Sequence, residues 1–125
     1  MFVINKDQSI YLTRGDIANI GVQANISDSV VYTFAVGDIV RFKVFEPNKC
    51  EKVVLVKDVN VTEETYTAII SLGAQDTRIG SIINKPKDYW YEIELNPNTT
   101  PQTIIGYDLN GPKIFRLYPE GGDIE

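Results

Sequence analysis

The clearest strand in this chain reads Asp88-Tyr89-Trp90-Tyr91-Glu92-Ile93-Glu94-Leu95. Successive side chains of an extended segment point to opposite faces, so every second residue shares a face. One face carries Tyr89, Tyr91, Ile93 and Leu95, and the other carries Trp90, Glu92 and Glu94. Two carboxylates on the second face indicate that this face is solvated.

The same two-residue period recurs along most of the chain, which at 125 residues has the size of one domain. Short strands at a spacing of about ten residues are typical of β-sandwiches and barrels. The sequence therefore predicts an all-β fold, an antiparallel β-sandwich (Ig-like or jelly-roll-like) of eight or nine short strands. We expect one domain at residues 1–118 and an acidic, flexible tail at 119–125. The other strands are expected at residues 1–5, 9–13, 18–24, 39–46, 52–61, 65–72, 103–107 and 113–118.

Turn residues predict which of these strands pair. We expect hairpins around residues 6–8, around residues 62–64 and around Asp108-Leu109-Asn110-Gly111. The third turn is the strongest signal, because Asn-Gly tolerates the positive φ angles of a tight hairpin. Pro112 follows directly and has no N–H to donate, so the strand at 113–118 is expected either to lie at a sheet edge or to begin just beyond the proline.

Residues 73–87 do not follow the two-residue period of the predicted strands. Ile79, Ile82 and Ile83 are spaced like one apolar face of a helix, and Asp76 is placed to cap its first turn. We therefore expect one short helical segment that crosses an end of the sandwich.

The composition excludes several kinds of chemistry. The chain has no histidine and one cysteine, which removes histidine catalysis, Cys–His nucleophiles, disulfide frameworks and nearly every zinc site. Its 12 Lys and Arg stand against 17 Asp and Glu, so neither nucleic acid nor an anionic membrane surface is an expected partner. No signal peptide or membrane-spanning run is recognisable, so we expect synthesis in the cytoplasm. No catalytic residue, cofactor or metal is predicted.

Three groups of residues suggest functional sites, and for each we favour a structural interpretation. Arg14-Gly15-Asp16 spells an adhesion tripeptide, but Gly-Asp also suits a turn between strands. Glu92 and Glu94 are spaced like the carboxylate pair of a glycosidase, but they share the face expected to be solvated. A third group could offer oxygen ligands to calcium, but without the spacing of a calcium loop; it comprises Asp76, Asp88 and Asp108.

Aromatic residues form the candidate contact surface. Tyr89-Trp90-Tyr91 places rings on both faces of one strand, so Trp90 either lies in the core under the crossing segment or stands exposed. Edge strands, at 113–118 or 1–5, offer backbone groups that a second copy of the chain could cover. We expect subunit contacts here, with a carbohydrate-binding platform on Trp90 and nearby tyrosines as the alternative. The candidate contact residues are Tyr89, Trp90, Tyr91, Phe115 and Tyr118.

The order of several short motifs resembles that of a known family. The motifs are Tyr32-Thr33-Phe34, Val36-Gly37-Asp38 with the strand at 40–44, Ser71-Leu72 with Asp76-Thr77, the aromatic-rich strand at 88–95 and the final hairpin. Over residues 30–118 this order is similar to small β domains of Gram-positive phage and prophage tails, above all the N-terminal domain of baseplate upper proteins.

This resemblance implies a β-sandwich that docks to the rest of a phage tail. It implies a non-catalytic structural or adaptor subunit, located in the tail or baseplate of the virion. The implied partners are other tail or baseplate proteins and further copies of the same chain.

Overall fold

The computed structural model describes residues 1–120, which form strands and one short helix. This confirms the all-β prediction. Of the predicted tail, residues 121–125 lie outside the described part, and Glu120 is held by an ion pair to Arg14. The strands are β1 (Phe2–Ile4), β2 (Ile10–Thr13), β3 (Ala18–Val22), β4 (Asn25–Ser27), β5 (Val30–Val31), β6 (Ile39–Glu46), β7 (Lys49–Asn60), β8 (Ala68–Leu72), β9 (Lys87–Leu95), β10 (Gln102–Ile105) and β11 (Lys113–Tyr118); the helix is α1 (Ala74–Thr77).

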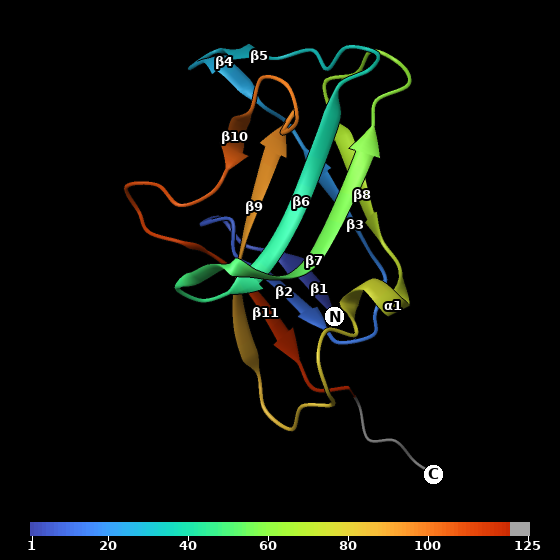
Figure 1. Ribbon diagram of the computed structural model, residues 1–125, viewed down its shortest axis with the longest axis vertical. Coiled ribbons are helices and arrows are strands. Elements are labelled where there is room, and N and C mark those ends of the chain that lie inside the picture. The colour runs from blue at the N-terminus through green and yellow to red at the C-terminus, as the bar shows by residue number, and fades with distance from the viewer. Residues whose placement is uncertain (121–125) are drawn as a thin grey trace.

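Strand β9 lies in the middle of a large sheet (Figure 1). The strand order is β1-β2-β11-β9-β6-β7, and β10 also pairs with β9. Along one edge of β9 runs β6, with Val40 opposite Leu95 and Phe45 opposite Trp90. Along the other edge, β11 pairs with the first half of β9 and β10 with its last residues. The backbone of β9 is therefore hydrogen-bonded on both sides.

The predicted edge position of residues 113–118 is wrong, because β11 lies between two strands. It runs antiparallel to β9 and parallel to β2. The parallel pair makes the sheet mixed, where a purely antiparallel one was expected. The other alternative is confirmed: the strand begins just beyond Pro112, at Lys113, so the proline does not prevent this pairing. The predicted N-terminal hairpin is confirmed by the pairing of β1 with β2, and β1 forms one edge of the sheet.

Two predicted strand pairs do not form. The predicted turn at Asp108-Leu109-Asn110-Gly111 is present, with backbone hydrogen bonds of 2.9 and 3.2 Å between Asp108 and Gly111 and a positive φ of 95° at Gly111. Within the described residues, however, β10 and β11 both pair with β9 and not with each other. Strand β7 pairs with β6, and β8 pairs with β3 in a separate two-stranded sheet. The turn at residues 62–64 therefore connects two sheets and not two neighbouring strands.

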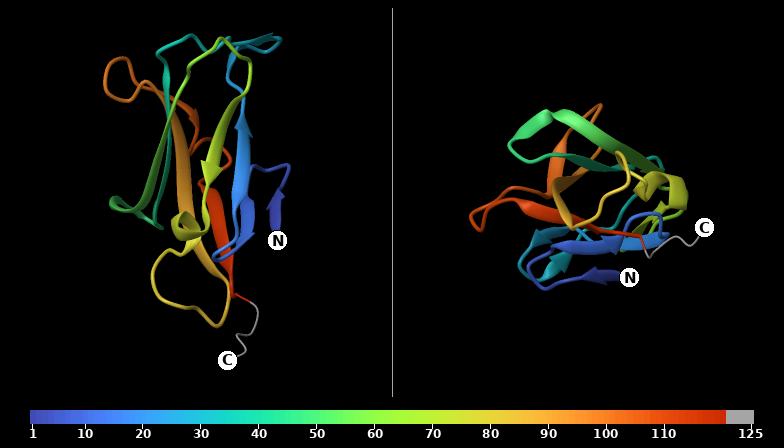
Figure 2. Two further views of the ribbon diagram at one scale, coloured as in Figure 1. Left: turned by 90° about the vertical axis from the view of Figure 1, so that its right-hand side faces the viewer. Right: turned by 90° about the horizontal axis from the view of Figure 1, so that it is seen from below.

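The sheet of β3 and β8 packs on the inner face of the large sheet, and the two layers share one core (Figure 2). Phe42 of β6 lies among the core side chains that the large sheet supplies. Its ring centroid is 5.6 Å from that of Tyr91 and 5.8 Å from that of Phe115. Both strands of the small sheet alternate buried and exposed residues as their sequence predicts. Their buried side chains are Ala18, Ile20, Val22, Ala68, Ile70 and Leu72.

The crossing segment is helical only at its start. The Asp76 carboxylate accepts a hydrogen bond of 2.8 Å from the Gly73 N–H, which confirms its capping role. The helix ends at Thr77, so the predicted apolar helical face is wrong: Ile79 is buried, but Ile82 is 80% exposed. Gly80 has a φ of 68°, a left-handed conformation that interrupts any helix here.

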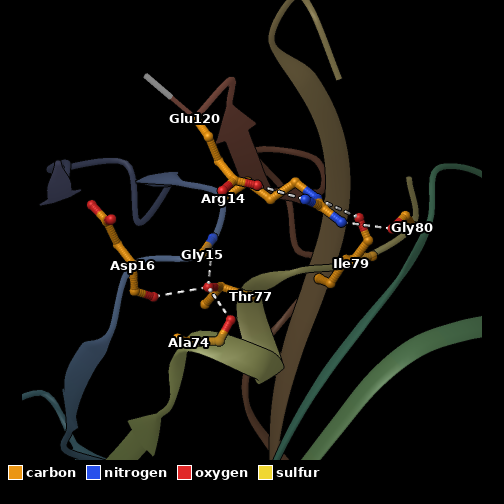
Figure 3. A network of polar contacts seen from close by, with 8 residues as sticks. All are labelled: Arg14, Gly15, Asp16, Ala74, Thr77, Ile79, Gly80 and Glu120. Atoms are coloured by element: carbon orange, nitrogen blue, oxygen red, sulfur yellow. Dashed lines mark hydrogen bonds and ion pairs between the residues drawn. The ribbon is translucent and has the colours of Figure 1, made fainter. Parts of the chain in front are cut away.

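Arg14 ties this segment to the N-terminal strands (Figure 3). Its guanidinium donates to the carbonyl oxygens of Ile79, at 3.1 Å, and Gly80, at 2.7 Å, and pairs with Glu120 at 2.6 Å. The Arg14 side chain is only 7% exposed, and Asp16 N–H donates to Thr13 in a turn. The turn interpretation of Arg14-Gly15-Asp16 is thereby confirmed, because a buried arginine is not available to an adhesion receptor.

Replacement of Ile70 by alanine tests the packing of the two layers. Ile70 is fully buried, so we expect Ile70→Ala to lower the free energy of unfolding by about 2–5 kcal/mol. The matched control is Ile82→Ala, which removes the same atoms from an exposed site and should change stability by less than about 0.5 kcal/mol. Urea denaturation of the two variants measures both values, and equal losses would contradict the two-layer core.

The Thr77 hydroxyl offers a second test, of the crossing segment. It accepts from the Gly15 N–H at 3.0 Å and donates to the Asp16 carbonyl at 2.8 Å, and the residue is fully buried. Thr77→Val keeps the shape but leaves both backbone groups without this partner, so we expect a loss of about 1–3 kcal/mol. Thr62→Val, at an exposed site, is the control and should be close to neutral in the same denaturation experiment.

Candidate contact surface

The structure separates the five predicted contact residues into two groups. Tyr89, Tyr91 and Phe115 are at most 2% exposed, so their prediction as contact residues is wrong. They point into the core because they occupy the inner face of β9 and β11. Burial raises the pKa of the Tyr91 hydroxyl, which donates to the carbonyl of Gln8. Trp90 and Tyr118 point the other way and are half-exposed on the outer face of the large sheet.

Residues of the neighbouring strands surround these two side chains. Ile114 of β11 is directly opposite Trp90, and Arg116 is opposite Tyr11 of β2. The Tyr107 ring packs edge-on against Trp90, with 5.7 Å between the centroids, and is 71% exposed. We call this group the aromatic surface: Tyr11, Trp90, Tyr107, Ile114, Arg116 and Tyr118.

Arg116 lies over the Tyr11 ring at one end of the aromatic surface. Its guanidinium carbon is 4.8 Å from the ring centroid of Tyr11, a cation–π distance. The Tyr11 and Tyr118 rings meet edge-on with their centroids 5.8 Å apart. Two hydrogen bonds, of 2.6 and 3.1 Å, join the guanidinium to the Asp88 carboxylate, and these bonds raise the pKa of Arg116. The cation is therefore held in one orientation.

Sequence reasoning missed four members of the aromatic surface. The signal for Tyr11 was available, because it alternates with Ile10 and Leu12 in a strand that was predicted. The position of Tyr11 beside Arg116 could not be predicted from the sequence, because the parallel pairing of β2 with β11 joins segments about a hundred residues apart. Tyr107 lies in the turn after β10 and reaches Trp90 only because β10 folds back along β9.

The two glutamates suggested as a catalytic pair are bound to a single lysine. The Lys43 ammonium lies 3.0 Å from Glu92 and 3.5 Å from Glu94 on the outer face. Burial alone lowers the pKa of Lys43, but the hydrogen bond and charge of Glu92, together with Glu94, outweigh this effect and raise it. The solvated-face interpretation therefore holds, since both carboxylates share one cation on the partly exposed outer face and neither lies in the apolar surroundings of a general acid.

The three aspartates suggested as calcium ligands each have a basic partner of their own. Asp76 pairs with Lys57, Asp88 with Arg116, and Asp108 with Lys113. Among residues 1–120, no cluster of three or more acidic or cysteine side chains is arranged to hold a metal ion.

Comparisons with protein families, with curated proteins and with solved structures gave no match for this chain. In the part of the chain that the structure describes, no helix has the length and hydropathy needed to span a membrane.

The single tryptophan makes the packing of the aromatic surface measurable. We expect Tyr107→Ala to shift the emission of Trp90 to longer wavelength and to increase its quenching by acrylamide, because the ring loses its cover. Tyr66→Ala, at another exposed tyrosine just before β8, should leave the emission unchanged. Identical spectra for both variants would contradict the contact between Tyr107 and Trp90.

Proposed function

We propose that this chain is a non-catalytic structural or adaptor subunit that works through protein–protein contacts at the aromatic surface. The observation that carries the proposal is the composition of that surface, in which a tryptophan, three tyrosines and an arginine gather on one sheet face. These residue types are enriched where binding energy concentrates in protein interfaces. Arg116 supports the proposal further, because its pair with Asp88 orders the side chain before a partner arrives.

The setting in a phage or prophage tail or baseplate, and hence in the virion, is part of this proposal. It rests on the resemblance in motif order over residues 30–118. The same resemblance makes other tail or baseplate proteins the proposed partners.

Contacts between copies of the chain are proposed at the edge strand β1. Its residues Phe2, Val3 and Ile4 are exposed and uncharged, whereas the opposite edge strand, β7, carries exposed charges such as Lys52. Charged edges resist pairing with another chain and uncharged ones permit it. An uncharged cleft of about 380 Å³, lined in part by Ile4, lies beside this edge.

The alternative of a carbohydrate platform on Trp90 has weaker geometric support. Sugar rings stack on an open aromatic face, whereas the Trp90 ring is half-buried and contacted by Tyr107. We therefore favour a protein partner for this surface.

Two matched arginine variants test the proposed function. The outer face carries a second pair of the same kind, Arg41 with Asp58 at 2.8 and 3.0 Å, outside the aromatic surface. We expect Arg116→Ala to weaken binding to a partner by about tenfold or more, and Arg41→Ala to leave it nearly unchanged. The measurement is biolayer interferometry between the purified chain and each protein encoded by the genes next to its own.

Light scattering over a range of concentrations completes this experiment by measuring self-association. A chain that binds none of these proteins and stays monomeric would contradict the proposed function. Equal losses for the two arginine variants would contradict the role of the aromatic surface.

A further inference from the structure

A cleft that is separate from the aromatic surface and from the cleft beside β1 lies between the short β4–β5 hairpin and β10. Figure 1 shows these elements at the same end of the molecule. The cleft has a volume of about 400 Å³, within the size range of small-molecule sites. It is lined by Ala24, Asn25, Ile26, Tyr32, Leu95, Asn96, Thr100, Gln102, Thr103 and Ile104.

None of these lining residues is charged, although charged residues make up 23% of the chain. Leu95 and Ile104 provide apolar surface, and Tyr32 adds an aromatic ring. The other side chains are mainly amides and hydroxyls. A phosphate or carboxylate would find no cationic partner here to replace its hydration, so a neutral ligand is favoured.

One wall of the cleft is fixed by a hydrogen-bond network around Asp38. The carboxylate accepts from the Tyr32 hydroxyl at 2.7 Å, from the Asn96 side-chain amide at 3.1 Å and from the Ala35 N–H at 2.9 Å. The Asn96 amide oxygen in turn accepts from the Ile39 N–H at 2.8 Å. Burial acts to raise the pKa of Asp38, but these hydrogen bonds outweigh it and lower the pKa. The wall is therefore ordered by hydrogen bonds within the chain itself.

The rim of the cleft, by contrast, has unused hydrogen-bonding capacity. Four exposed side chains make no side-chain hydrogen bond to any residue in 1–120: Asn25, Thr100, Gln102 and Thr103. Amides and hydroxyls both donate and accept, which matches the hydroxyl groups of a sugar. A fixed wall with an aromatic ring and a rim of such groups is the arrangement expected of a pocket that orients a ligand by a few polar contacts.

We propose that this cleft binds a short, uncharged oligosaccharide. The C–H groups of the sugar contact Leu95, Ile104 and the accessible part of the half-buried Tyr32 ring, without stacking on an open aromatic face. The sugar hydroxyls exchange hydrogen bonds with Asn25 and Gln102. Asp38 sits behind the Tyr32 hydroxyl and adds a negative charge that disfavours anionic ligands. This site shares no residue with the aromatic surface, so it does not depend on the proposed protein–protein function.

NMR titration of the 15N-labelled chain tests this proposal. The probes are neutral trisaccharides of glucose, galactose, mannose and N-acetylglucosamine, with trigalacturonate as the anionic comparison. We expect saturable shifts of the Asn25 and Gln102 side-chain amide signals with at least one neutral probe and none with trigalacturonate. The Gln102→Ala variant should bind about three- to tenfold more weakly, as for the loss of one or two hydrogen bonds.

The matched control is Gln75→Ala, which removes an exposed glutamine from α1 and should bind like the unmodified chain. The proposal is overturned if no neutral probe gives saturable shifts at millimolar concentration, or if Gln102→Ala binds as well as Gln75→Ala. It is also overturned if the shifts centre on Trp90 and Tyr107, a result that would place sugar binding on the aromatic surface. None of these outcomes changes the expectation for Arg116→Ala, so the two proposals fail separately.

Discussion

The central strand β9 is hydrogen-bonded along both edges and buried along one face, and the rest of the structure is arranged around it. Its edges hold β6 on one side and β10 and β11 on the other. Its inner face places Tyr89, Tyr91 and Ile93 in the core beneath the small sheet. A strand held in this way has little freedom to shift register, because a shift by one residue would exchange its buried and exposed faces. The position of Trp90 on the outer face follows directly from this constraint.

The outer face of the large sheet carries two arginine–aspartate pairs of the same geometry in different surroundings. Arg41 with Asp58, and Arg116 with Asp88, are both two-bonded pairs between neighbouring strands. Exposed pairs of this kind contribute little to stability, about 0–1 kcal/mol. The Arg116 pair differs in lying over Tyr11, which combines an ordered cation with aromatic rings. The proposed function therefore assigns this pair a role in recognition rather than in stability.

The polar networks at the two ends of the molecule differ. At the end near α1, the Arg14 guanidinium and the Thr77 hydroxyl satisfy the backbone of a segment that forms no strand. At the other end, Asp38 orders Tyr32 and Asn96, and an open cleft remains beside them. In the network near α1 the Arg14 and Thr77 side chains are hydrogen-bonded to other residues of the chain. At the rim of the cleft, side-chain donors and acceptors remain available to a ligand. That difference explains why one end is structural and the other is a candidate binding site.

The sequence by itself determined the fold class and the two faces of the main strands. Alternation at residues 18–22, 39–46 and 89–95 depends only on neighbours in the chain, so it can be read without knowledge of the pairing. Only the tertiary structure decided which strands lie side by side. Pro112 and the turn at 62–64 suggested an edge and a hairpin, but β11 is internal and β8 pairs with β3. Pairing depends on burying apolar faces contributed by distant segments, and for the same reason the aromatic surface and the cleft could not be assembled from local patterns.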